Sequence, residues 1–221
     1  MHDLPPTIQH PRRTLLKLVA LAITSLALAV PTMAAASPPP RLLGHLEGQI
    51  WSTILAVPAH QSPPPDPCLK LGDGVVAPYG IDITCVVKPG TRIYVFGVEA
   101  ECDNAEPPPF YGATYSDQVA CARADLSGIT ARSTVDGRAI PTVDATSPPE
   151  SITLPENNID QVPAGPITFA VHGLAALSDP LPPGTHTFKS HFEFPQPSGP
   201  PQQGDESFHV QVVPASHGSR R

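Results

Sequence analysis

Four acidic side chains close together in the middle of the chain are the first candidates for chemistry. They are Glu99, Glu101, Asp103 and Glu106, which place four carboxylates within eight residues. Carboxylate oxygens are ligands that Ca²⁺ prefers, and two carboxyl groups with different pKa values can act as general acid and general base. Calcium loops of the EF-hand kind turn on a glycine, and this stretch has none between Gly97 and Gly112. We therefore expect a solvated loop pinned by a disulfide, with a ligand or cation site as the second interpretation and catalysis as the third.

Histidines near the C-terminus are weaker candidates. The strand period of two puts His191 and His209 on polar faces of segments 185–194 and 207–213. If these strands pair, the two imidazoles could be neighbours, an arrangement that suits copper or zinc. Histidines on a solvated face usually bind nothing, so we expect no metal there. His186 falls on the opposite, apolar face, where we expect it at the edge of the core or bonded to a turn.

No motif for nucleophilic catalysis occurs in the sequence. It contains no Gly-x-Ser-x-Gly elbow, no His-Glu-x-x-His and no phosphate-binding glycine loop. We expect no cofactor, and an extracellular hydrolase using the carboxylates of the 99–106 loop is the only enzymatic alternative that we retain.

Four cysteines, at positions 68, 85, 102 and 121, indicate two disulfides. Zinc sites usually bring two ligands within about two to four residues of each other, and no two of these cysteines are that close. Four cysteines allow three pairings, and the sequence does not choose among them. We favour Cys68 with Cys85 and Cys102 with Cys121, because each of these bonds closes a short local loop.

The N-terminal residues have the pattern of an export signal. An apolar run over 15–30 follows Arg12 and Arg13 and precedes small residues up to Ala36, as in a secretory signal peptide. The segment from Arg12 to Lys17 resembles the twin-arginine export pattern, and ordinary Sec export is the alternative. We expect a signal peptide over 1–36, a proline-rich leader over 37–45, one secreted β-rich domain over 46–214 and a flexible tail over 215–221.

Within this domain the sequence predicts mainly β structure. Leu46, Ile50, Ile54 and Val57 recur at helical spacing, with Trp51 beside them as a core anchor, and Ser116 could cap a second short helix. The stretch between Glu99 and Tyr115 is expected to be irregular. Short β-branched runs separated by turn residues favour an antiparallel β-sandwich-like domain with one or two short helices. The expected strands are 80–87 and 91–98 as a hairpin, 129–135 and 138–143 as a hairpin around Asp136-Gly137, 150–154, 167–171, 185–194 and 207–213.

Five local motifs follow one another along the domain: Thr84-Cys85-Val86-Val87-Lys88-Pro89-Gly90, Glu101-Cys102, Val135-Asp136-Gly137, Pro155-Glu156-Asn157-Asn158 and Pro182-Pro183-Gly184-Thr185-His186. Together these motifs resemble a family of small secreted bacterial proteins of unassigned function. They consist of cysteines, turns and strand entries, so the resemblance implies one exported domain and no particular reaction.

The composition of the chain excludes some classes of function. The chain has 31 prolines in 221 residues, and they fall mostly between predicted elements. Its formal net charge of −7 provides no basic surface for nucleic acid. We expect an exported, disulfide-stabilised protein with a non-catalytic binding or cell-envelope role, whose partner is an extracellular or cell-wall ligand, with no membrane span after signal cleavage.

Overall fold

Eleven strands and two α-helices make up the part of the chain that the computed structural model describes, residues 37–62, 64–196 and 199–214. The predicted signal peptide over 1–36 and tail over 215–221 lie outside the described residues. Among the helices that are described, none has the length and apolar character needed to cross a membrane.

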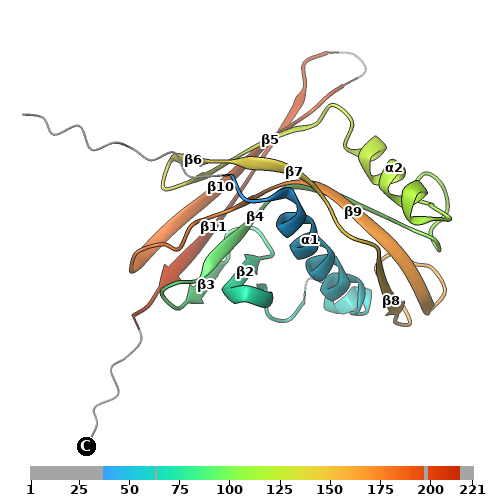
Figure 1. Cartoon of the computed structure of the whole chain (residues 1–221), viewed down its shortest axis with the longest axis horizontal. Coiled ribbons are helices and arrows are strands. Elements are labelled where there is room, and N and C mark those ends of the chain that lie inside the picture. Colours follow the sequence, from blue (N-terminus) through green and yellow to red (C-terminus); the bar gives the residue numbers. More distant parts are fainter. Residues whose placement is uncertain (1–36, 63, 197–198, 215–221) are drawn as a thin grey trace, which may run out of the picture. The chain divides into compact units, whose positions relative to one another are not determined.

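The strands form two sheets (Figure 1). The six-stranded sheet has the order β1 (Cys68–Lys70), β2 (Val75–Pro78), β4 (Arg92–Asp103), β9 (Gly165–Leu177) and β7 (Thr142–Thr146), and β8 (Glu150–Leu154) pairs with the other half of β9. The five-stranded sheet has the order β3 (Thr84–Val87), β11 (Gln202–Val212), β10 (Gly184–Phe194), β5 (Thr130–Val135) and β6 (Arg138–Ile140). The predicted β-sandwich-like class is confirmed. Two pairs, β2 with β4 and β3 with β11, are parallel and depart from the antiparallel expectation.

The central strand β4 is buried on both faces. Ile93 and Val95 contribute to the core between the sheets, where the rings of Phe188 and Phe208 stack with centroids 4.9 Å apart. Tyr94 faces the opposite way, into a second core beneath helix α1 (Pro40–Leu55). A helix covers one side of β4 and a sheet covers the other, which explains why its first part, from Ile93 to Val98, is a continuous apolar run.

Helix α1 begins at Pro40, inside the segment expected to be a leader. Proline suits the first turn of a helix: N–H groups there have no acceptor within the helix, so the N–H that proline lacks is not missed. Gly44 lets the helix lie very close to β7, since a Cβ at that position would come within 2.0 Å of the Thr146 carbonyl oxygen. The spacing of apolar residues therefore predicted the helix correctly, but its first residue, Pro40, precedes the predicted pattern.

The hairpin predicted over 80–87 and 91–98 is wrong. β3 joins the five-stranded sheet beside β11, whereas β4 lies in the six-stranded sheet beside β2 and β9. The Lys88-Pro89-Gly90 turn carries the chain from one sheet to the other, because each run finds its hydrogen bonds with distant strands.

The hairpin predicted around Asp136-Gly137 is confirmed, but the strand predicted over 138–143 ends at Ile140, and residues from Thr142 onward belong to β7 in the other sheet. Val135 pairs with Arg138, and Asp136 and Gly137 both have positive φ, at 50° and 76°, as a two-residue turn of this kind requires. The other predicted strands are present as β8, β9, β10 and β11, with β9 and β11 longer than expected.

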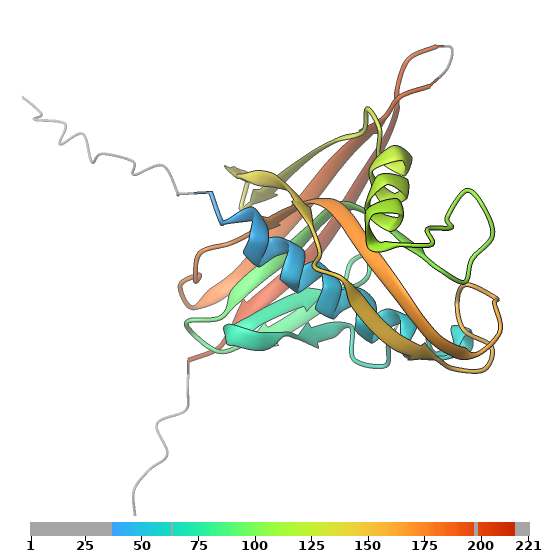
Figure 2. The same ribbon diagram turned by 45° about the vertical axis from the view of Figure 1, so that its right-hand side comes forward.

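Helix α2 (Tyr115–Asp125) is present, but its cap is Thr114 and not Ser116. Thr114 Oγ1 accepts from the Asp117 N–H, and Asp117 Oδ2 accepts from the Thr114 N–H at 3.0 Å, a reciprocal capping box. Ala122 and Leu126 of this region pack on Ala100 and Cys102 of β4. Figure 2 shows α2 beside β9.

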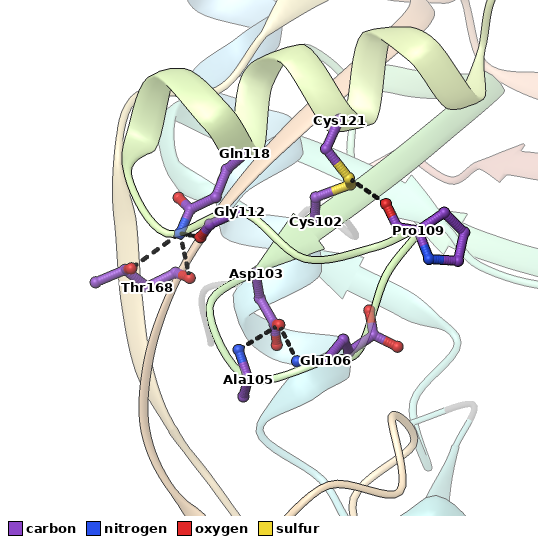
Figure 3. The surroundings of a disulfide bond; sticks show 9 residues. All are labelled: Cys102, Asp103, Ala105, Glu106, Pro109, Gly112, Gln118, Cys121 and Thr168. Atoms are coloured by element: carbon purple, nitrogen blue, oxygen red, sulfur yellow. Dashed lines mark hydrogen bonds between the residues drawn. A yellow bond between two sulfur atoms is a disulfide. The ribbon is translucent and has the colours of Figure 1, made fainter.

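Both disulfides have the sequential pairing. Cys68 bonds Cys85 and Cys102 bonds Cys121, with Cα atoms 5.6 and 6.1 Å apart. The first bond joins β1 to β3 and therefore connects the two sheets, whereas the second joins β4 to α2 (Figure 3).

Candidate functional site

The predicted acidic loop is mostly a strand, and the expectation that it is solvated is wrong. β4 continues to Asp103, and the side chains of Glu101 and Asp103 are only 7% and 0% exposed. The pairing of β4 with β9 shifts between Phe96 and Val98. This bulge re-aims the following residues, so that Glu99 lies on the same side as Tyr94 and helix α1.

Glu99 accepts two hydrogen bonds. The Trp51 indole N–H donates to Oε2 at 2.8 Å, and the Tyr94 hydroxyl donates to Oε1. The same hydroxyl lies 3.3 Å from Oε1 of Glu47, a fully buried carboxyl group on α1. A tyrosine hydroxyl has one proton, so both contacts of this hydroxyl are hydrogen bonds when Tyr94 donates to Glu99 and a protonated Glu47 donates to the Tyr94 oxygen, while Glu47 Oε2 has no partner among the described residues.

Burial changes the protonation of both carboxyl groups. Desolvation, followed by the charge of Glu99, raises the pKa of Glu47 to about 9. Desolvation also raises the pKa of Glu99 to about 7, although the bonds from Tyr94 and Trp51 oppose the rise. At neutral pH Glu47 is therefore a neutral acid.

Glu99 also lines a pocket of about 480 Å³, a volume within the range of roughly 300–1,000 Å³ that is usual for small-ligand sites. Its walls come from α1, the segment between β2 and β3, and strands β4, β10 and β11. Six of the lining residues are aromatic: Trp51, Tyr79, Phe96, Phe192, Phe194 and Phe208. The pocket thus joins residues that are far apart in the sequence.

The charged side chains of this aromatic pocket are both acidic. Glu99 lies among the partly buried residues, and Glu206 is exposed, with a pKa raised by desolvation. No lysine, arginine or histidine is among the described residues that line it. Ile81 at the same pocket is 65% exposed, an unusual exposure for a large apolar side chain.

A second group of carboxylates lies beyond Glu99. Glu101, Glu106 and Asp160 each contribute one carboxylate oxygen, and these three oxygens lie within 4.8 Å of one another. Asp103 is adjacent in sequence, and its Oδ1 accepts from the N–H groups of Ala105 and Glu106 at 2.8 and 2.7 Å (Figure 3). Burial and mutual repulsion raise the pKa of Glu101 to about 9, that of Glu106 to about 7 and that of Asp160 to about 6. The four predicted residues therefore divide, with Glu99 in the pocket and the others outside it.

The structure does not bring the two candidate histidines together. β10 and β11 pair, but His209 lies opposite Thr187, whereas His191 lies opposite Asp205. His191 Nδ1 is 2.8 Å from Asp205 Oδ1, and His209 Nδ1 is 3.2 Å from Thr187 Oγ1. Each imidazole is thus engaged separately.

The turn-bonded expectation for His186 is confirmed. This side chain is 7% exposed, and its Nδ1 lies 2.7 Å from Oδ2 of Asp136, in the β5–β6 turn.

Sequence reasoning missed Glu47, Asp160, Glu206 and the aromatic pocket itself. Glu47 carried a signal, since it interrupts the apolar face of α1, four residues after Leu43 and three before Ile50. Asp160 and Glu206 carried none, because their roles depend on which distant segments fold beside them.

Comparisons with known proteins do not place the chain in a family. No protein-family model matches it, and no curated protein does. Among solved structures, a cysteine protease inhibitor from Entamoeba histolytica overlaps 63% of this chain and 94% of its own, at 13% identity and a TM-score of 0.25. The sandwich assignment therefore depends on the two sheets observed in this chain.

Proposed function

We propose that this chain is an exported, disulfide-stabilised binding domain without catalytic activity, and that it holds an apolar ligand in the aromatic pocket. The observation that carries the proposal is a preformed pocket with six aromatic residues and a partly buried carboxylate. Such concave, mainly apolar sites with few polar groups are the usual form of small-ligand sites.

The charges in the pocket select the ligand class. An anionic ligand would meet Glu99 and Glu206 with no basic side chain among the described lining residues to balance it. A cationic ligand would be attracted by both carboxylates and by the faces of the aromatic rings. We infer a preference for apolar ligands that are cationic or neutral.

The pocket is held in shape without a ligand. Its segment from Pro78 to Ile81 lies within the loop that the Cys68–Cys85 disulfide closes. The Tyr79 N–H donates to the Pro67 carbonyl at 2.7 Å, and the Asp82 N–H donates to the Ser207 carbonyl at 2.8 Å. A site organised before binding loses little conformational entropy when the ligand enters.

Export is supported by the two disulfides, which persist in oxidising compartments. The signal peptide, the choice between twin-arginine and Sec export, and membership of the secreted bacterial family stay predictions. An extracellular or cell-wall ligand follows from export.

The hydrolase alternative also stays a prediction. Glycosidases place two carboxyl groups roughly 5–10 Å apart on either side of the substrate. Of the four carboxylates predicted from the sequence, only Glu99 lines the pocket, so a hydrolase would have to take its second carboxylate from Glu206.

Trp51 is the single tryptophan of the chain and lines the pocket, so its fluorescence reports on binding. We would titrate the protein with benzyltrimethylammonium, benzyl alcohol and phenylacetate, three probes of similar size and different charge. The proposal expects saturable changes with the first two, at least tenfold weaker binding of phenylacetate, and loss of binding in Phe192→Ala. Phe110→Ala, which alters an exposed aromatic residue outside the pocket, is the matched control. Equal binding of all three probes, or no saturable change with any, would overturn the proposal.

A further inference from the structure

We propose that Glu101, Glu106 and Asp160 form a binding site for a hard divalent cation, Ca²⁺ being the best fit. Glu101 belongs to β4, Glu106 to the segment that follows it, and Asp160 to the connection between β8 and β9. One carboxylate oxygen from each lies within 4.8 Å of the other two. The site is separate from the aromatic pocket, and its existence does not depend on the function proposed for that pocket.

Buried oxygens without hydrogen-bond donors are an independent indication that this cluster takes a ligand. Glu101 is 7% exposed, and its Oε1 accepts no hydrogen bond from the described residues. Asp160 Oδ2 and Asp103 Oδ2 lack donors in the same way. A buried acceptor left without a partner destabilises the folded state, and more so when it is charged.

Among the described residues, no cationic side chain pairs with the carboxylates of the cluster, since no ion pair includes Glu101, Asp103, Glu106 or Asp160. A bound cation would supply the missing positive charge and at the same time occupy the free lone pairs.

Both segments that carry the ligands are fixed by bonds of their own. On the β4 side, Asp103 Oδ1 holds the turn through Ala105 and Glu106, and Asn104 Oδ1 accepts from the Thr168 N–H of β9 at 3.0 Å. On the other side, the Asn158 amide donates to the Val162 carbonyl at 2.8 Å and accepts from its N–H at 3.2 Å. The carboxylates are therefore brought together before any ion arrives.

The number of carboxylate ligands favours calcium over magnesium. Oxygens bind Ca²⁺ at about 2.3–2.6 Å and Mg²⁺ at about 2.0–2.1 Å, with a stricter geometry for Mg²⁺. Mg²⁺ is usually held by one or two carboxylates and keeps several waters, whereas Ca²⁺ accepts several carboxylates in a flexible arrangement, which fits three carboxylates gathered from separate segments. With three carboxylates and water completing the shell, we expect a dissociation constant of about 10⁻⁴–10⁻³ M, as in extracellular calcium modules.

The test is titration of the chelator-treated protein with CaCl₂ in a calorimeter, with MgCl₂ as the comparison. We expect one Ca²⁺ per chain and at least tenfold weaker binding of Mg²⁺. Glu106→Gln and Asp160→Asn should each weaken Ca²⁺ binding at least tenfold. Glu156→Gln, an exposed carboxylate in the same β8–β9 connection that is not part of the cluster, should leave it unchanged.

Folding of the variants is checked by circular dichroism, and removal of one carboxylate relieves repulsion within the cluster, so both should fold without the ion. Absence of a heat signal up to 10 mM CaCl₂ would overturn the proposal. Equal affinity of the wild type and both cluster variants would also overturn it, because the ion would then bind elsewhere.

Discussion

His186 should make the stability of this domain depend on pH, because both of its ring nitrogens face hydrogen-bond acceptors. Nδ1 lies 2.7 Å from Asp136 Oδ2, and Nε2 lies 2.9 Å from the Pro182 carbonyl oxygen. A neutral imidazole has one N–H, so only the imidazolium donates to both. The hydrogen bond with Asp136 is the main cause that raises the pKa of His186 and lowers the pKa of Asp136.

The two shifts have opposite dependences on pH. A histidine whose pKa is higher in the folded state adds stability below its unfolded pKa of about 6.5, and this contribution is lost as pH rises through the folded pKa. A carboxylate whose folded pKa is lowered adds stability above its unfolded pKa of about 3.9, and this is lost as pH falls through the folded pKa. The pair should therefore stabilise the domain most between about pH 4.5 and 6.5.

Asp136→Asn isolates the charge of the pair. Asparagine tolerates the positive φ of 50° at this position and keeps an oxygen for the Thr187 N–H, which now donates to Oδ1 at 2.9 Å. A hydrogen bond to a charged group contributes about 1.5–3 kcal/mol. Because the Asp136 side chain is 47% exposed, solvent screening lowers the expected loss in free energy of unfolding to about 1–2 kcal/mol at pH 5.5. At pH 8 the loss should fall to about 0.5 kcal/mol, since a neutral histidine makes a weaker bond.

Urea unfolding of the wild type and the variant at pH 5.5 and 8.0 measures these losses. Asp205→Asn is the matched control, because His191 Nδ1 lies at a similar 2.8 Å from Asp205 Oδ1 but the two side chains are 32% and 81% exposed. We expect little change from this control at either pH. A loss for Asp136→Asn that is the same at both pH values, or that grows with pH, would refute the two-acceptor argument.

Three further predictions concern packing, the disulfides and the buried acid. Gly44→Ala should lower the free energy of unfolding by about 2 kcal/mol or more in urea titration, because its Cβ would lie 2.0 Å from a backbone oxygen, whereas Gly72→Ala, with no atom nearer than 3.8 Å, should cost much less. Replacing Cys68 and Cys85 together by alanine should cost about 3 kcal/mol or more in the same assay, as expected for a loop of this length. Glu47→Gln should stabilise the domain more at pH 8 than at pH 5, because a carboxyl group with a folded pKa of about 9 makes stability fall as pH rises above its unfolded pKa of about 4.5. No change in the Gly44 variant, an unaltered midpoint without the disulfide, or a uniform effect of Glu47→Gln would contradict the respective arguments.

The parts of the fold that the sequence predicts correctly depend on local physical rules. Asp136 and Gly137 both have positive φ, and the predicted turn is present at these two residues. The cysteines paired in sequential order, first with second and third with fourth, and each bond closes a short loop. The prediction of a hairpin over 80–98 was wrong because its two segments, although adjacent in sequence, pair with strands of different sheets. The local sequence contains no information about which distant strands they pair with.

The site was predicted less well, for a related reason. Four carboxylates in eight residues correctly indicated a segment that contributes to both candidate sites. The high polarity of this segment predicted a solvated loop, but Asp103 is fully buried. The residues that complete the two sites, Trp51 and Asp160, come from elements dozens of positions away. Their participation follows only from the docking of α1 on the sheet and from the path of the β8–β9 connection.

One irregularity in β4 accounts for the arrangement of both sites and of the second disulfide. Without the shift at Gly97, strand alternation would turn Glu99 and Glu101 toward α2, into contact with Ala122 and Leu126. With the shift, the even-numbered residues from Val98 to Cys102 face α2, where Cys102 bonds Cys121, and Glu99 and Glu101 face the side of α1. Glycine is needed at the bulge because a Cβ at residue 97 would lie 2.1 Å from the Leu174 carbonyl oxygen. A one-residue change of register therefore separates an apolar, disulfide-linked face from a face that carries the pocket carboxylate and the acidic cluster.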